Sequence, residues 1–136
     1  MTKNKILATT IMGVLAVTAT SAFAGAQYIF PVEISDNADG SGEADGAIGT
    51  ARHEDNETSE IGCYIYKYGT STTVRATCYA SDADGNYRVC DTTNSALIDI
   101  IRFVGDGTWI IFDWDASGKC TSADMENASG YEPKAP

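Results

Sequence analysis

Four cysteines follow an N-terminus that has the pattern of a secretory signal peptide, and this combination restricts the fold more than any other feature. Residues 1–5 are basic, residues 6–17 are largely apolar, and residues 22–24 read Ala-Phe-Ala, a cleavage site before Gly25. Exported proteins meet oxidising conditions, in which an even number of cysteines predicts disulfides. We therefore expect a secreted or periplasmic protein with two disulfides. The cysteines are Cys63, Cys78, Cys90 and Cys120.

The charge balance limits the partners that the protein can bind. The chain of 136 residues carries 19 Asp and Glu against 9 Lys and Arg, a net charge of −10. This balance argues against nucleic acid, because a phosphate backbone needs cationic side chains to neutralise it. After residue 24 no apolar run approaches the ~20 residues of a membrane helix, so no membrane span is expected once the signal peptide is removed.

Three parts are expected along the chain. They are a signal peptide at residues 1–24, an acidic, glycine-rich flexible segment at 25–46, and a single disulfide-stabilised domain at 47–136 that ends in a polar tail. Residues 35–46 contain three glycines and four acidic residues but no large apolar side chain. Such a stretch cannot bury enough surface to offset the entropy of ordering it, which predicts a mobile loop or linker.

Two expected hairpins place cysteines opposite each other. A turn at residues 70–71 puts Cys63 opposite Cys78, within disulfide reach. A turn at residues 83–85 puts Cys78 opposite Cys90 as well. One cysteine cannot form both bonds, so the sequence leaves all three connectivities open. The pairing that we favour is Cys63–Cys78 with Cys90–Cys120.

The fold expected from these patterns is of the α+β class. Apolar residues recur at helical spacing over residues 95–104, where Asn94 or Thr92 can act as the N-cap. Further strands are expected at residues 47–53, 108–114 and 119–125. The prediction is a small antiparallel sheet of about five strands with one helix packed on it, stabilised by the disulfides.

Four short motifs occur in a fixed order along the chain. They are Gly62-Cys63-Tyr64-Ile65, Cys78-Tyr79-Ala80, Trp114-Asp115-Ala116-Ser117-Gly118-Lys119-Cys120 and Asn127-Ala128-Ser129-Gly130-Tyr131-Glu132-Pro133-Lys134. Over about residues 47–134 the chain resembles an uncharacterised group of small exported bacterial proteins that have a signal peptide, four cysteines and a Trp-Asp-x-x-Gly-x-Cys motif. The resemblance implies export and a disulfide-stabilised fold. It implies no activity and supplies no catalytic or binding residue.

Few residues suggest catalysis or metal binding. His53 is the only histidine, and a lone surface histidine requires no function. Asp113 and Asp115 form an acidic pair of the kind that glycosidases use, although turn chemistry accounts for Asp115. Residues 39–45 and 82–86 contain parts of a calcium loop without completing one, so calcium binding stays open. We predict no catalytic residue, no cofactor and no enzyme activity, and we assign no metal ligand.

A set of tyrosines is the strongest candidate for a binding surface. It comprises Tyr64, Tyr66 and Tyr68 on one face of a strand and Tyr79 on the next strand, with Arg75 opposite Tyr66 and suited to a cation–π contact. If the helix at 95–104 packs on the other face, which holds Cys63, these tyrosines are exposed. If it covers them instead, they belong to the core.

The sequence favours a protein that binds rather than one that transforms its partner. The first hypothesis is an exported binding or structural module of the cell envelope or extracellular space, with an unknown protein or glycan partner. The alternative is an acidic inhibitor of a basic secreted enzyme, such as a lysozyme-like hydrolase, because net negative charge would steer such a partner. The second alternative is a small hydrolase that uses two carboxylates.

Overall fold

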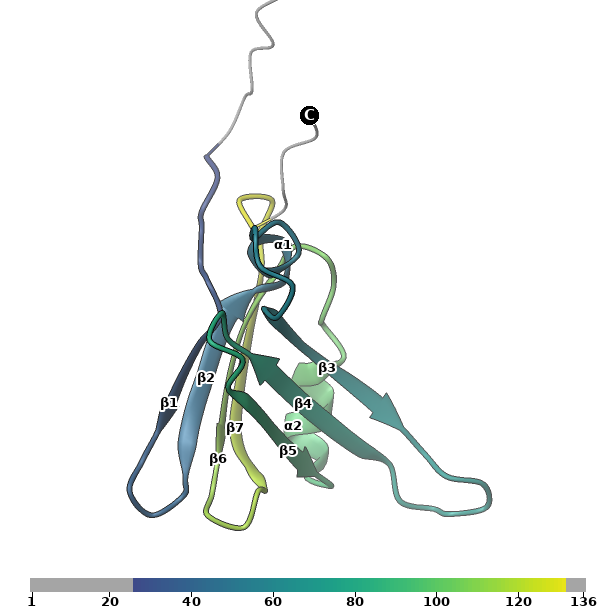
Figure 1. Ribbon diagram of the computed structural model, residues 1–136. Coiled ribbons are helices and arrows are strands. Elements are labelled where there is room, and N and C mark those ends of the chain that lie inside the picture. Colours follow the sequence, from purple (N-terminus) through teal and green to yellow (C-terminus); the bar gives the residue numbers. More distant parts are fainter. Residues whose placement is uncertain (1–25, 132–136) are drawn as a thin grey trace, which may run out of the picture.

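The computed structural model describes residues 26–131, so the predicted signal peptide and the end of the polar tail lie outside the described residues. Within this range the chain forms seven strands and two short helices. The strands make two antiparallel sheets, which lie close together near α1 and diverge toward their other end (Figure 1). No helix among residues 26–131 is both long enough and apolar enough to cross a membrane.

Sheet A has four strands in the order β1-β2-β6-β7. They are β1 (Glu33–Asp36), β2 (Gly42–Ala47), β6 (Thr108–Trp114) and β7 (Cys120–Asn127). Because side chains alternate between the faces of a strand, β6 directs Ile110, Phe112 and Trp114 to one side, and all three are buried there. This side is the inner face of sheet A and supplies the largest side chains of the core.

Small residues of β2 lie beside these large ones. Ala44 pairs with Phe112 and Gly42 pairs with Trp114. A Cβ atom on Gly42 would lie 2.5 Å from the Trp114 ring, so only glycine leaves room for the indole. The prediction of a flexible segment at residues 25–46 therefore does not hold for residues 33–36 and 42–46, which form strands. Gly42 and Ala44 of β2 lie beside the bulky residues of β6, and Ile34 of β1 packs against the core.

Sheet B has three strands in the order β3-β4-β5. They are β3 (Glu60–Tyr66), β4 (Arg75–Ser81) and β5 (Tyr87–Thr92). The register agrees with both expected hairpins, since Cys78 lies opposite Cys63 on one side and opposite Cys90 on the other. Gly85 adopts a positive φ of 81°, as the second turn requires.

Two short helices complete the described residues. In α2 (Ser95–Ile101) the Asn94 side chain accepts a hydrogen bond from the N–H of Ala96, which confirms Asn94 as the N-cap. The helix ends before residue 104 because the N–H of Phe103 turns back to the carbonyl of Ile100 in a tighter turn. Helix α2 contacts β7 of sheet A and both β3 and β4 of sheet B.

The strand expected at residues 47–53 is not formed. The chain leaves β2 at Ala47 and enters helix α1 (Ile48–Ala51). The N–H groups of Arg52 and His53 donate to the carbonyls of Ile48 and Thr50, so they are not available to a neighbouring strand. The expected fold class is therefore right in its outline, an antiparallel α+β fold with disulfides, but one sheet of five strands is replaced by two sheets.

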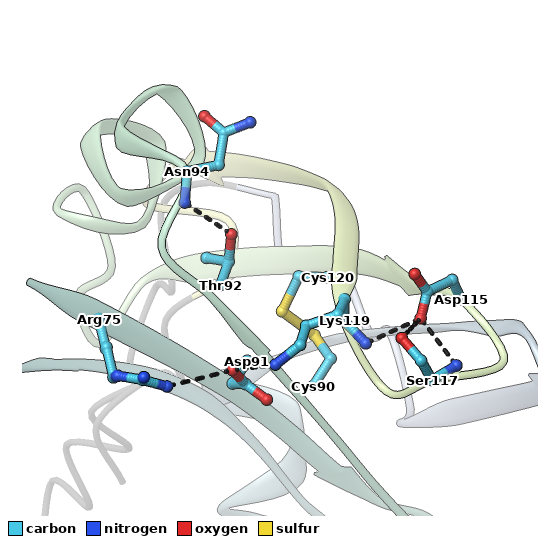
Figure 2. Close-up of polar contacts among 9 residues, drawn as sticks. All are labelled: Arg75, Cys90, Asp91, Thr92, Asn94, Asp115, Ser117, Lys119 and Cys120. Atoms are coloured by element: carbon cyan, nitrogen blue, oxygen red, sulfur yellow. Dashed lines mark hydrogen bonds and ion pairs between the residues drawn. A yellow bond between two sulfur atoms is a disulfide. The ribbon is translucent and has the colours of Figure 1, made fainter.

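The two disulfides are Cys63–Cys78 and Cys90–Cys120, which is the pairing that we favoured from the sequence. Cys63–Cys78 joins neighbouring strands within sheet B, whereas Cys90–Cys120 joins β5 of sheet B to β7 of sheet A. Beside the second disulfide the N–H of Asp91 donates to the carbonyl of Gly118. Figure 2 shows this inter-sheet junction, where Asp91 and Lys119 flank the sulfur atoms.

The inter-sheet disulfide is expected to contribute more stability than the disulfide within sheet B. A loop-entropy treatment gives about 3.6 kcal/mol for Cys90–Cys120, which spans 30 positions, and about 3.0 kcal/mol for Cys63–Cys78, which spans 15. Urea unfolding of Cys90→Ser/Cys120→Ser and of Cys63→Ser/Cys78→Ser measures how much free energy of unfolding each variant loses. A larger loss in Cys63→Ser/Cys78→Ser would contradict the greater contribution of the inter-sheet disulfide.

Candidate functional site

The predicted tyrosines lie on the outer face of sheet B. Helix α2 and the core cover the inner face, where Ala76 and Cys78 are completely buried. On the outer face Tyr64 is 52% exposed and Tyr68, beyond the end of β3, is 73% exposed. Tyr66 and Tyr79 are partly buried. We call this surface, with Tyr64, Tyr66, Tyr68, Tyr79 and Tyr87, the tyrosine face.

Four of the five rings of the tyrosine face, those of Tyr64, Tyr66, Tyr68 and Tyr79, form a series of neighbouring pairs. The ring centroids of Tyr66 and Tyr68 are 5.0 Å apart, those of Tyr64 and Tyr66 are 5.6 Å apart, and those of Tyr64 and Tyr79 are 6.4 Å apart. These separations are within the range of favourable aromatic pairs. The ring planes of these pairs are inclined to one another by 34–67°, so the rings do not form one flat platform.

Gly62 gives Tyr79 its place on this face. The two residues are direct partners across β3 and β4. A Cβ atom on Gly62 would lie 2.9 Å from the Tyr79 hydroxyl oxygen, so the ring lies across the bare glycine backbone. An aromatic ring that covers a cross-strand glycine in this way shields the backbone and fixes its own orientation.

Arg75 lies opposite Tyr66, as the register predicted, but its charge is directed to an aspartate. Its guanidinium is 3.7 Å from the Asp91 carboxylate, and the Lys119 ammonium donates to the same carboxylate at 2.7 Å (Figure 2). This end of the tyrosine face thus carries a small network of mixed charge. It connects β4 of sheet B with the turn that precedes β7.

Sequence reasoning missed three residues of the outer face. Tyr87 and Val89 on β5 are 50% and 46% exposed, and Glu60 begins β3 on the same side. The signal was present in the second hairpin, because the register that places Cys90 opposite Cys78 also places Val89 opposite Tyr79. The alternation of side chains along β5 then brings Tyr87 to the same face.

The outer face of sheet A has a different character, because it is acidic. Six carboxylates alternate outward from its four strands: Glu33, Glu43, Asp45, Asp113, Asp124 and Glu126. Within residues 26–131 none of the six takes part in an ion pair. The sheet therefore presents unneutralised negative charge on the side away from the core.

Glu43 and Asp113 are direct partners across β2 and β6 in this acidic face. Partial burial raises the pKa of Glu43 above its usual 4.5, and the charge of Asp113 and a shared hydrogen bond with it raise the pKa further. A cavity of about 510 Å³ opens beside the pair. As direct cross-strand partners, the two residues have Cβ atoms about 4.5–5.5 Å apart.

The acidic turn residues have local partners. Asp115 accepts hydrogen bonds from the N–H groups of Ser117 and Lys119, so turn chemistry accounts for it. Asp82 likewise accepts from the N–H groups of Asp84 and Asn86. Residues 26–131 contain no group of three or more His, Cys, Asp or Glu side chains placed to hold a metal ion.

Glu43→Gln is expected to stabilise the protein at neutral pH but not in acid. A carboxyl whose pKa is raised on folding stabilises the folded state fully below its usual pKa, and that contribution is lost as the pH rises through the raised value. At pH 7 the variant should therefore melt about 2–4 °C higher, the size expected for an exposed charge pair. At pH 3.5 the two melting temperatures should coincide.

Thermal unfolding at the two pH values measures this difference. Glu57→Gln, in the exposed loop before β3, removes one negative charge elsewhere and serves as the control. Equal shifts of Glu43→Gln at pH 3.5 and pH 7 would contradict the coupling between Glu43 and Asp113.

Comparisons with known proteins leave the function to be inferred from these surfaces. No protein-family model, curated protein or solved structure matches the chain. The resemblance to small exported four-cysteine proteins therefore stays a prediction.

Proposed function

We propose that this protein is an exported binding module of the cell envelope or extracellular space, and that it holds its partner through the tyrosine face without transforming it. The observation that carries the proposal is the exposure of a continuous set of aromatic rings on a sheet whose other face is core. Large exposed aromatic surfaces on small proteins mark interaction sites, since tyrosine combines apolar area with a polar hydroxyl.

The rigidity of the support favours the same function. The tyrosine face stands on strands that are joined to each other by Cys63–Cys78 and to sheet A by Cys90–Cys120. A surface held in its binding shape loses little conformational entropy when a partner arrives, which increases affinity. Disulfides persist in oxidising compartments, so the same feature supports a secreted or periplasmic location.

A second candidate function is supported by the acidic face of sheet A. Six carboxylates that form no ion pair within residues 26–131, together with a net charge of −10, would attract a basic protein, as an acidic inhibitor of a basic secreted enzyme requires. Binding through this face would weaken steeply as salt rises, because exposed charges are screened. Contacts of a partner with the aromatic rings of the tyrosine face would themselves depend on salt only weakly.

Loss of the exposed Tyr64 and Tyr68 rings should abolish most of the binding to the partner. Tyr64→Ala/Tyr68→Ala is expected to reduce capture of the partner from envelope and culture-fluid fractions at least about tenfold, the effect of losing ~1.4 kcal/mol of binding energy. The measurement compares the proteins retained by the oxidised wild type and by the variant, quantified by mass spectrometry. Both rings are largely exposed, so the fold should be unaffected.

The matched control removes two equally exposed rings elsewhere. Tyr28 is 52% exposed and Phe103 is 69% exposed, close to the values of Tyr64 and Tyr68. Tyr28→Ala/Phe103→Ala should retain whatever the wild type retains. If both double variants capture the same proteins in the same amounts as the wild type, the tyrosine face is not the binding surface.

A further inference from the structure

One corner of the tyrosine face combines aromatic rings with a carboxylate. Glu60, Ser81 and Tyr87 form one row across the three strands of sheet B, and Tyr79 lies in the next row. Ser81 is small, so its row has large side chains only at its two ends. We call Glu60, Tyr64, Tyr79 and Tyr87 the Glu60 corner.

The negative charge of this corner is not neutralised by the neighbouring residues. Within residues 26–131 Glu60 takes part in no ion pair. Burial raises the pKa of the Tyr87 hydroxyl, and the negative charge of Glu60 raises it further. Arg52 lines the same cavity of about 230 Å³ as Glu60 and Tyr79, but its guanidinium binds Asp106 at 3.0 Å.

We propose that the Glu60 corner receives an arginine or lysine side chain of a basic protein partner. This inference rests on the proposed function and names the chemistry of the partner. Glu60 supplies the opposite charge, and the rings of Tyr64, Tyr79 and Tyr87 supply faces that attract a cation.

The chemistry of the corner favours a cation over a sugar. A sugar ring stacks best on an open aromatic plane, whereas the planes of Tyr64 and Tyr79 are inclined by 51° and those of Tyr64 and Tyr66 by 34°. Tyr79 lines the same cavity as Glu60, and a ring beside a carboxylate suits the compact charge of an ammonium or guanidinium group. The acidic face of sheet A and the net charge of −10 would accelerate the approach of such a partner without fixing where it docks.

A short peptide tests the proposal directly. The probe is an acetylated and amidated peptide of alternating glycine and arginine, and its neutral analogue carries citrulline in place of arginine. Added to the oxidised full chain, the arginine peptide should shift the NMR signals of Tyr64, Tyr79 and Tyr87. The citrulline peptide should bind at least about tenfold more weakly, because it keeps the shape and loses the charge.

Two pairs of variants separate the corner from general attraction. Glu60→Gln and Glu33→Gln each remove one exposed negative charge from a strand, but only Glu60 lies on the face of sheet B that carries the tyrosines. Glu60→Gln should lower the affinity for the arginine peptide about tenfold, and Glu33→Gln should lower it less than about twofold. Tyr87→Phe keeps the aromatic ring and should retain the affinity for the arginine peptide, whereas Tyr87→Leu should lose that affinity.

Three results would overturn the proposal. They are equal losses in Glu60→Gln and Glu33→Gln, equal affinities of the arginine and citrulline peptides, and peptide-induced shifts confined to sheet A. If one of them occurs while Tyr64→Ala/Tyr68→Ala still loses its captured partner, the tyrosine face remains the binding surface and only the cationic partner is wrong. If Tyr64→Ala/Tyr68→Ala retains its partner, the proposed function itself fails.

Discussion

The arrangement of the two sheets depends on the junction at Cys90–Cys120. This disulfide joins β5 to the start of β7, and the ion pair of Lys119 with Asp91 and the hydrogen bond from Asp91 to Gly118 lie directly beside it. A second ion pair, from Arg88 on β5 to Asp36 on β1, connects the same two sheets on the other side. These contacts hold sheet B with its inner face on the core and its outer face in solvent.

The core explains why so small a protein can leave a whole sheet face uncovered. Ile110, Phe112 and Trp114 fill the space between the sheets, and Ile98 and Ile101 of α2 pack against them. Small domains bury a limited share of their surface, so covalent links commonly supplement their cores. With the inner faces occupied and the sheets cross-linked, the outer face of sheet B needs no covering layer. It can hold side chains selected for binding instead.

Local patterns predicted sheet B and the β6–β7 hairpin of sheet A well, but they missed β1 and β2. The hairpin register around Cys63 and Cys78 follows from a short turn and alternating side chains, and the Asn94 cap follows from its position before an apolar helical repeat. Strand β2 could not be found in this way, because Gly42 and Ala44 are ordered by contact with Trp114 and Phe112, which are distant in sequence. An acidic, glycine-rich stretch carries no local sign of such neighbours.

The candidate site was predicted only where a single hairpin places its residues. The exposed position of Tyr64 and Tyr68 follows from the face that the helix covers, and this depends on one hairpin only. The Glu60 corner needs three strands in register, so Tyr87 enters only when the two hairpins are combined. Charge separation between a tyrosine face on sheet B and an acidic face on sheet A is likewise a property of the assembled sheets rather than of any one segment.

Binding through the tyrosine face requires that its rings are exposed to solvent on a rigid sheet, and the most direct test is to measure the accessibility of these rings. Photo-CIDNP of the oxidised protein with a flavin dye reports which tyrosine rings the dye can reach. The structure predicts strong signals from Tyr64, Tyr68 and Tyr87 and none from Tyr131, which is 8% exposed. Silent Tyr64 and Tyr87 rings would contradict the account, because the face that they share would then be covered.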